Sequence, residues 1–258
     1  MSLQRGRIVS VGDRVRQGSM QPIYAEIELP GGVRTSTICK FPTRSNRAPI
    51  EQVINEWIVT VAGRLVGLQV PPCYIVEASP HVMLHLVERH GVTLACNFGF
   101  AAEVCPIDAL IYPSSLDAMD PEDLTRLFCF DMLFLNADRT PNNPNCGQSN
   151  RRLFAYDFGS ALVSPGTAPN SFERLFFGPN MADRAAAHLC RSHVGPSVMA
   201  QKVLQDLIAA VSKNRWYAGM NLKFLPVALQ EQMRLAVQYF DYVVQERDLL
   251  CRQIVSTL

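Results

Sequence analysis

The sequence lacks the features that would direct a protein to a membrane, to nucleic acid or to secretion. No run of about 18 unbroken apolar residues, the length that a spanning helix needs, occurs in it. Lys and Arg number 24 against 23 Asp and Glu, so no net field draws the chain to nucleic acid or to a lipid surface. The first residues, MSLQRGRIVSVGD, lack the apolar core of a signal peptide. We therefore expect a cytoplasmic protein with no membrane partner and no direct nucleic-acid partner.

The cysteines and histidines lack the spacing of a metal site. The eight cysteines contain no CxxC pair and no matching His spacing, which argues against zinc. Because most of them lie inside apolar runs, we expect buried free thiols in a reducing cytosol rather than disulfides. His81, His85 and His90 lie close together without a carboxylate partner, so core or solvated histidines are expected there rather than ligands.

The first 103 residues are dominated by strand patterns. RIVSVGDRVR is typical of a strand, and IYAEIEL alternates and is followed by the turn signal PGG, so it predicts an antiparallel hairpin with VRTSTICKFP. Lys40 falls at the end of the second strand. Residues 51–67 have apolar positions at helical spacing and end at Gly67, which predicts a helix with Glu56 near its middle. PPCYIVEA and LACNFGFAAEV indicate further strands, and HVMLHLVERHG fits either a strand or a short helix.

From about residue 104 the patterns become helical. PEDLTRLFCFDMLFLN predicts a buried helix that begins near Asp120 and Pro121, with acids in its first turn. A polar loop and the strand RLFAYDF follow, and most of the remaining sequence is amphipathic helix. The sequence therefore predicts an α+β fold of two lobes. Residues 1–103 would form a small β-rich N-terminal lobe with one helix, and residues 104–258 a larger helical C-terminal lobe.

A polar loop interrupts the apolar sequence of residues 131–162, DMLFLNADRTPNNPNCGQSNRRLFAYDFGSAL. Asp138 and Asn143 have the D-x-x-x-x-N spacing of a kinase catalytic loop, and a gap of β-hairpin length separates them from Asp157 in DFG. Phosphoryl transfer requires positioning, a magnesium clamp and a carboxylate near the attacking hydroxyl. Asp138 fits that carboxylate, while Asn143 and Asp157 supply the hard oxygen ligands that Mg²⁺ prefers. The combination indicates a metal-nucleotide site.

Each of these residues also has an ordinary structural interpretation. A loop rich in Asn, Asp and Pro satisfies turn geometry locally, and DFG recurs by accident. Lys40 fits equally a strand-end lysine in solvent, and Glu56 fits an acid on a helix surface. Asn55 is another polar residue on the same helix, but it is less able to pair with a lysine. The functional interpretation rests on the combination of the motifs rather than on any one of them.

The combined motif resembles the signature of the HipA-like kinases. LNADRTPNNPN is similar to their loop N-x-D-R-x-x-x-N-P-N, and LFAYDFGSAL to their metal strand. GSMQPIYAEI resembles their phosphate-covering region, ICKFP the strand with the ATP lysine, and NEWIVTVAGRLVGLQVPP the helix with its glutamate. LACNFGF resembles the strand leading into the hinge. The likeness covers roughly residues 18–162, and the helices after it match only in type.

The resemblance implies a role for each candidate residue. Lys40 would pair with the nucleotide phosphates, and Glu56 would hold Lys40 in place. Asp138 would be the catalytic carboxylate, with Asn143 and Asp157 on Mg²⁺. Gly18 and Ser19 lie in the GSMQP turn, whose backbone N–H groups would form a nest for the phosphates unless this is a plain turn.

The sequence also departs from this family pattern. Phe158 stands where many of these relatives have His, so the metal motif is closer to that of ordinary protein kinases. No G-x-G-x-x-G precedes Lys40. HVMLHLVERHG does not align with any family segment.

We therefore predict a two-lobed protein-kinase-like protein that binds ATP and Mg²⁺ in a cleft near residues 98–104. Its predicted activity is transfer of the γ-phosphoryl group to a Ser or Thr hydroxyl on a protein substrate. The same residues would also suit a small molecule or a lipid head group. Alternatives from other classes are a catalytically silent kinase-fold binding or regulatory module, and a toxin-type regulator that works with an antitoxin or a DNA-binding protein partner.

Overall fold

The computed structural model describes residues 4–15, 21–44, 50–162, 167–176, 179–214, 223 and 225–258. The chain divides into two compact units, and each is described here by itself. The first unit comprises Met1–Ile58, Pro71–Cys105 and Gly219–Met233, and the second comprises Val59–Val70, Pro106–Ala218 and Arg234–Leu258. The division at residues 103 and 104 stays a prediction.

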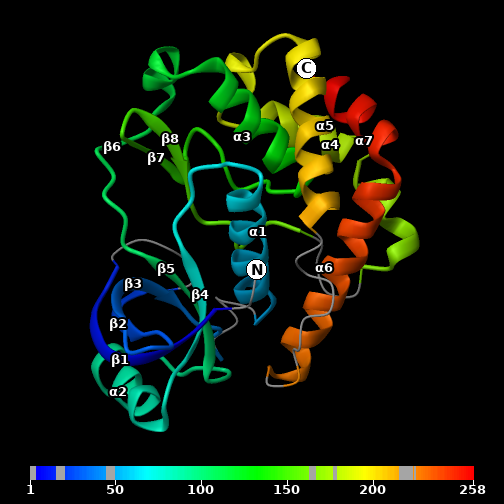
Figure 1. Cartoon of the computed structure of the whole chain (residues 1–258). Helices are drawn as coiled ribbons and strands as arrows, with labels where there is room; N and C mark the ends of the chain where they lie inside the picture. Colours follow the sequence, from blue (N-terminus) through cyan, green and yellow to red (C-terminus); the bar gives the residue numbers. More distant parts are fainter. Residues whose placement is uncertain are drawn as a thin grey trace. The chain divides into compact units, whose positions relative to one another are not determined.

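The first unit contains a closed five-stranded barrel with the strand order β1-β2-β3-β5-β4 (Figure 1). The hairpin predicted from IYAEIEL and PGG is confirmed, because β2 pairs with β3 in antiparallel register and Gly31 and Gly32 in its turn have φ of 88° and 78°. β1 and β4 are parallel and close the barrel, and the other pairs are antiparallel. The strands are β1 (Arg5–Arg14), β2 (Ile23–Glu28), β3 (Arg34–Lys40), β4 (Cys73–Glu77) and β5 (Phe98–Glu103).

The segment HVMLHLVERHG, which fitted either a strand or a helix, forms the helix α2 (Pro80–His90). Ser79 caps its start, and Gly91, with φ of 65°, ends it. Val82 and Leu86 of α2 belong to the same apolar core as the alternating buried residues of the barrel, so α2 packs on the barrel beside β1 (Figure 1). The strand expected from Leu94 is shorter than predicted, because β5 begins only at Phe98.

The predicted helix over residues 51–67 is α1 (Ile50–Leu65). It ends before Gly67, whose φ of 82° is a left-handed conformation that favours glycine. The residues up to Ile58 belong to the first unit, and those from Val59 onward belong to the second. α6 (Val227–Gln245) is shared between the units in the same way, with the division after Met233.

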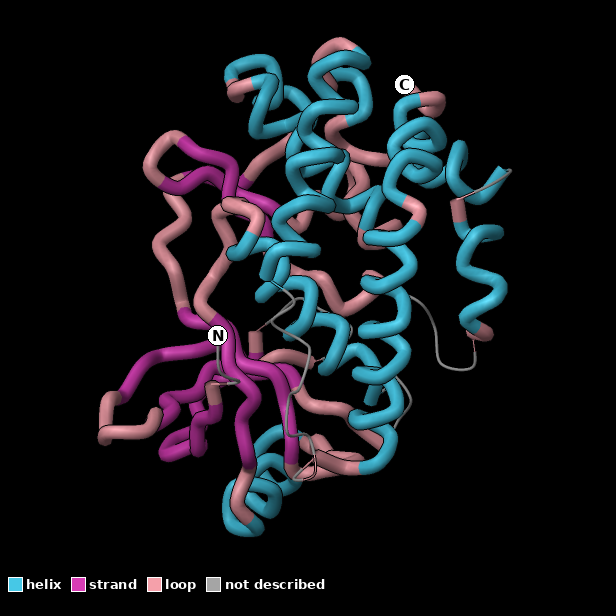
Figure 2. Tube along the Cα trace, turned by 45° about the vertical axis from the view of Figure 1, so that its right-hand side comes forward, coloured by secondary structure: helices cyan, strands magenta, loops and turns pink. Residues whose placement is uncertain are grey.

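The second unit is built around α3 (Pro121–Leu133), which begins at the N-cap Asp120 as the sequence predicts. Almost every residue of α3 from Leu124 onward is buried, and α3 contacts α4, α5 and α7. The amphipathic sequence from residue 227 to residue 255 forms two helices rather than one, α6 and α7 (Arg247–Val255), because the first helix ends before Glu246. Figure 2 shows the helices in cyan. The α-helices that follow β8 in the chain are α4 (Pro179–Ala187), α5 (Ser197–Asn214), α6 and α7.

A small three-stranded sheet lies in the second unit. The gap between Asn143 and Asp157 is a β-hairpin, whose two turn residues Asn150 and Arg151 have φ of 51° and 62°, as a type I′ turn requires. The short strand β6 and the 3₁₀ helices have too few residues to give a sequence pattern. These elements are β6 (Ala109–Leu110), β7 (Cys146–Ser149), β8 (Arg152–Ala155), η1 (Pro113–Ala118), η2 (Pro169–Leu175) and η3 (Arg191–His193).

The cysteines behave as the sequence predicts. All eight are free thiols, and all but Cys96 and Cys105 are buried. Among the described residues, no helix combines the length and the apolar character needed to cross a membrane.

Gly99 is the glycine at which we expect the barrel to be most sensitive to an added methyl group. A Cβ at Gly99 would lie 2.6 Å from ring carbons of Phe41 and 2.7 Å from the carbonyl oxygen of Lys40. Gly99→Ala should therefore destabilise the protein by about 1–3 kcal/mol, as overpacking does. Gly63→Ala on α1 is the control, because its Cβ would meet Val70 and Phe130 at ordinary distances of 3.4–3.6 Å. Equal urea midpoints for the two variants would contradict this prediction.

Candidate active site

Lys40 and Glu56 form an ion pair inside the first unit. Lys40 is the last residue of β3, and Glu56 lies on α1. The Lys40 Nζ atom is 3.0 Å from Glu56 Oε2, and the two side chains are only 12% and 2% exposed. Because the pair is sheltered from water, it differs from the weak ion pairs of protein surfaces. The expected pairing is confirmed, and the alternative of a solvated lysine with a surface acid is wrong.

The predicted phosphate-covering turn cannot be placed beside this pair, because Gly18 and Ser19 lie outside the described residues. Asn55, the other polar residue considered on α1, does not replace Glu56 as the partner of Lys40. Its Oδ1 atom accepts a hydrogen bond from Gln232 Nε2 at 2.8 Å.

The loop between α3 and β7 holds Asp138 through its backbone and its side chain. The Asp138 backbone N–H donates to Asn136 Oδ1 at 3.3 Å, and the Asn143 Nδ2 group donates to the Asp138 carbonyl oxygen at 3.2 Å. Asn145 Nδ2 donates to the carboxylate oxygen Oδ2 at 3.3 Å. Asp138 is half-buried and Asn143 is exposed. The two residues predicted from the D-x-x-x-x-N spacing therefore lie side by side in one loop.

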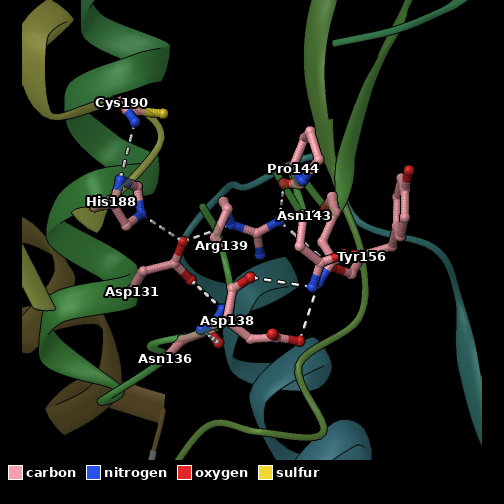
Figure 3. A network of polar contacts seen from close by, with 10 residues as sticks. Asp131, Asn136, Asp138, Arg139, Asn143, Pro144, Tyr156, His188 and Cys190 are labelled. Atoms are coloured by element: carbon pink, nitrogen blue, oxygen red, sulfur yellow. Dashed lines mark hydrogen bonds and ion pairs between the residues drawn. The ribbon is translucent and has the colours of Figure 1, made fainter. Parts of the chain in front are cut away.

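Arg139, the residue after Asp138, anchors this loop (Figure 3). Its side chain is fully buried, and its Nε donates to Asp131 Oδ2 at 2.5 Å. Its Nη1 donates to the carbonyl oxygens of Pro144 and Asn145, and it lies 3.5 Å from that of Tyr156. A single guanidinium thus ties α3 to the end of the loop that precedes β7 and to the residue before Asp157.

Asp131 is the buried acceptor at the centre of this network (Figure 3). Besides Arg139, it accepts from Asn136 Nδ2 at 2.8 Å, and His188 Nε2 lies 2.9 Å from its Oδ2 atom. The backbone N–H of Cys190 donates to His188 Nδ1 at 3.0 Å, so His188 carries its proton on Nε2 and donates it to Asp131. Burial alone would raise the pKa of Asp131, but Arg139 and His188 together hold it below its ordinary value.

Asp157 follows β8 and has a left-handed backbone with φ of 62°, which is unusual for a residue with a side chain. The residues on either side of it are held by Arg139. The carbonyl oxygen of Tyr156 faces the guanidinium, and the Phe158 ring lies 5.1 Å from the Arg139 Cζ atom. Phe158 is fully buried and also packs edge-to-face on Phe130 of α3. The unusual conformation of Asp157 is therefore fixed on both sides.

The three residues predicted for catalysis and metal binding, Asp138, Asn143 and Asp157, all belong to the second unit and are positioned by Arg139. Within the described part of the chain, no three His, Cys, Asp or Glu side chains are grouped as a metal cage. The donor set is instead one carboxylate and one amide, both hard oxygen ligands. Such a set suits Mg²⁺, which takes one or two protein ligands and completes its shell with substrate phosphates and water.

Sequence reasoning missed the residues that support this loop. Asp131 left one signal, because a charged residue within the apolar helix LFCFDMLFLN requires a buried partner. Asn145 belongs to the loop motif, but its contact with the Asp138 carboxylate depends on its left-handed φ of 46°. His188 lies 57 residues from Asp131 and has no pattern around it that would identify it.

Comparisons with known proteins agree with this geometry. A sequence model of a family described as "HipA-like kinase" matches residues 8–230, a longer range than the motifs alone indicate. No curated protein sequence matches the chain. The proinflammatory kinase CtkA of Helicobacter pylori has a similar solved structure, with a TM-score of 0.57, 10% sequence identity and coverage of 95% of both chains. At this identity the similarity shows the fold alone, which is protein-kinase-like with mixed strands and helices.

A second solved structure is that of the Rio2 kinase–ADP/Mg²⁺–phosphoaspartate complex from Chaetomium thermophilum. It has 16% identity and a TM-score of 0.34, and the match covers 81% of this chain and 72% of that one. A TM-score this low adds nothing to the assignment of the fold.

We predict that Asp131→Asn destabilises the protein by about 3–5 kcal/mol, because it leaves the buried Arg139 guanidinium without its counter-charge. Asp13→Asn is the matched control, since Asp13 pairs with Arg89 on the surface and is 84% exposed. Chemical denaturation of the three proteins at neutral pH measures the difference. A loss no larger than that of the control would show that Arg139 does not depend on Asp131.

The low pKa of Asp131 also predicts how this difference varies with pH. A carboxylate whose pKa is lower in the folded state stabilises the fold above its ordinary pKa of 3.8, and that stability is lost as the pH falls through the folded value. The gap in unfolding free energy between wild type and Asp131→Asn should be constant at neutral pH and narrow below about pH 4. If the difference in unfolding free energy between the two proteins grew at acid pH, the prediction would be contradicted.

Proposed function

Because the chain belongs to the HipA-like kinase family, we propose that it transfers the γ-phosphoryl group of ATP to a Ser or Thr hydroxyl of a protein, with Mg²⁺ as the metal. The observation that carries the proposal is the Arg139 network, which fixes the backbone on both sides of Asp157 and the loop that holds Asp138. Phosphoryl transfer depends on such positioning more than on covalent chemistry.

Asp138 would orient the attacking hydroxyl and accept its proton. Asn145 Nδ2 donates to its Oδ2 atom and so restrains the carboxylate. The other oxygen, Oδ1, would then be the one that meets the hydroxyl. The backbone of Asp138 is held by Asn136 and Asn143, so the side chain need not be reorganised when the acceptor arrives. A positioned carboxylate of this kind contributes about 10²–10⁴-fold as a general base.

Asp157 and Asn143 would hold the metal. The Asn143 amide nitrogen donates to the Asp138 carbonyl, so its amide oxygen is the atom available as a ligand. Bound Mg²⁺ would neutralise charge on the nucleotide phosphates. Asp157 would supply the carboxylate, and its fixed backbone would keep it in place while the nucleotide exchanges.

Lys40 would bind the nucleotide phosphates, as the lysine on strand β3 does in protein kinases. Glu56 is nearly fully buried, so its charge keeps the Lys40 ammonium oriented rather than free to follow solvent. The choice of a protein hydroxyl as acceptor rests on the resemblance of the sequence motifs to those of the HipA-like kinases and not on a contact in this chain. A small molecule and a lipid head group are therefore included among the acceptors to be tested.

We predict that nucleotide binding requires Mg²⁺ and Asp157. ATP with Mg²⁺ should raise the melting temperature of the wild type, because a ligand that binds only the native state stabilises it. The shift should collapse in Asp157→Asn, which keeps the size of the side chain but removes its charge. Asp108→Asn, a change of the same type in the loop before β6, is the control. An undiminished shift in Asp157→Asn would refute the metal assignment.

The second prediction concerns Asp138. Asp138→Asn should leave ATP affinity nearly unchanged, because Asn143 and Asp157 hold the metal. Turnover should fall about a hundredfold or more, the scale of lost general-base assistance. Purified protein with γ-labelled ATP and Mg²⁺ measures transfer to protein, small molecules, lipids and water. If binding and turnover fell together, Asp138 would be a ligand or structural residue, and a wild type with no transfer to any acceptor would be a silent binding module.

A further inference from the structure

A buried hydrogen bond joins α1 to α6 next to the Lys40–Glu56 pair. Asn55, the residue before Glu56, has its Oδ1 atom 2.8 Å from Gln232 Nε2. Both residues are nearly fully buried, at 5% and 3% exposure, although they are 177 positions apart in the sequence. Gln232 lies in the part of α6 that belongs to the first unit, as Lys40 and Glu56 do.

The surroundings of this bond are apolar. Leu229, three positions before Gln232 on α6, and Met233, the residue after it, are buried. Val53 and Ile54 are buried just before Asn55 on α1. Apolar contacts are non-directional, so they specify the orientation of a helix less sharply than a hydrogen bond does. A buried amide that loses its partner carries the full desolvation penalty, so this hydrogen bond resists such movement.

Asn55 and Glu56 are consecutive residues, so their side chains leave α1 about 100° apart around the helix axis. Asn55 is bonded to Gln232 of α6, and Glu56 is bonded to Lys40 of β3. Two bonds in different directions fix the rotation of a helix, whereas one bond alone leaves it free to pivot. Any rotation of α1 that took Glu56 from Lys40 would also break the bond between Asn55 and Gln232.

We propose that Gln232 is a positioning residue that holds α1 in the orientation at which Glu56 meets Lys40. The inference rests on the proposed function, because the Lys40–Glu56 pair matters for catalysis only if Lys40 binds the nucleotide. In protein kinases the corresponding Lys–Glu ion pair forms only when the helix that carries the glutamate is correctly positioned. In this protein α6 supplies that control from within the chain, through a side chain that is not among the residues proposed to hold the nucleotide or the metal.

The proposal is tested by the ATP affinity of Gln232→Met, in which an isosteric apolar side chain removes the hydrogen bond. ATP affinity in the presence of Mg²⁺, measured by calorimetry, should fall about tenfold, since Lys40 is no longer held by a correctly oriented Glu56. Gln238→Met is the control, because Gln238 is an exposed residue on the same helix. An unchanged affinity in a folded Gln232→Met protein would overturn the proposal.

Lys40→Met separates positioning from a merely structural role. If Gln232 acts through Lys40, then Gln232→Met should cause no further loss of ATP affinity in the Lys40→Met background, because residues that act as one unit are not additive. An equal loss in both backgrounds would mean that the bond only stabilises the fold, and would overturn the proposal. A wild type that binds no ATP would instead refute the proposed function, which makes the two failures distinguishable.

Asn55→Leu combined with Gln232→Met keeps the test usable if the single variant does not fold. Replacing both partners by apolar groups of similar size leaves no unsatisfied amide, so much of the stability should return. The proposal requires that ATP affinity stays about tenfold low in this double variant even though its unfolding midpoint recovers. Recovery of affinity together with stability would overturn it.

Discussion

The arrangement of the second unit depends on one buried cation, the guanidinium of Arg139. An arginine remains charged at every ordinary pH, so its burial requires a counter-charge from the protein. Asp131 supplies that charge, and the Nε and Nη1 groups of Arg139 have acceptors, whereas its buried Nη2 group has none among the described residues. Burial alone would lower the pKa of Arg139, but the neighbouring Asp131 carboxylate raises it. The guanidinium is planar, so its N–H groups point in fixed directions. The carbonyl oxygens that it meets belong to the loop that carries Asp138 and to the residue before Asp157. The site geometry follows from the requirement to neutralise this charge.

The same principle operates at α1 in the first unit. The apolar core of the barrel fixes which elements pack together, but its contacts are non-directional. Buried polar contacts define positions more narrowly. In the first unit they join Lys40 with Glu56 and Asn55 with Gln232, and in the second unit they join Asp131 with His188. Each of these contacts involves a residue that adjoins or supports a candidate catalytic group. A small displacement of such a group would matter most for phosphoryl transfer.

The parts of the structure that sequence predicted are those set by local chemistry. Alternation with PGG specified the β2–β3 hairpin and placed Lys40 at its end, and Asp120 with Pro121 specified the start of α3. The D-x-x-x-x-N spacing placed Asp138 and Asn143 in one loop. His188 and Gln232 could not be found in this way, because their roles depend on contacts across 57 and 177 positions. The segment HVMLHLVERHG stayed ambiguous because a short apolar run fits the residue spacing of a helix and that of a strand. In the structure it is a helix, with Ser79 and Gly91 as its cap residues.

Phe158, the phenylalanine of DFG, is part of the Arg139 network. Phe158 is fully buried, with its ring 5.1 Å from the Arg139 Cζ atom and packed on Phe130. The negative face of an aromatic ring attracts the guanidinium, and its apolar edge fits the phenylalanine beside it. Phe158, the residue after Asp157, is therefore joined to the guanidinium that also holds the loop of Asp138.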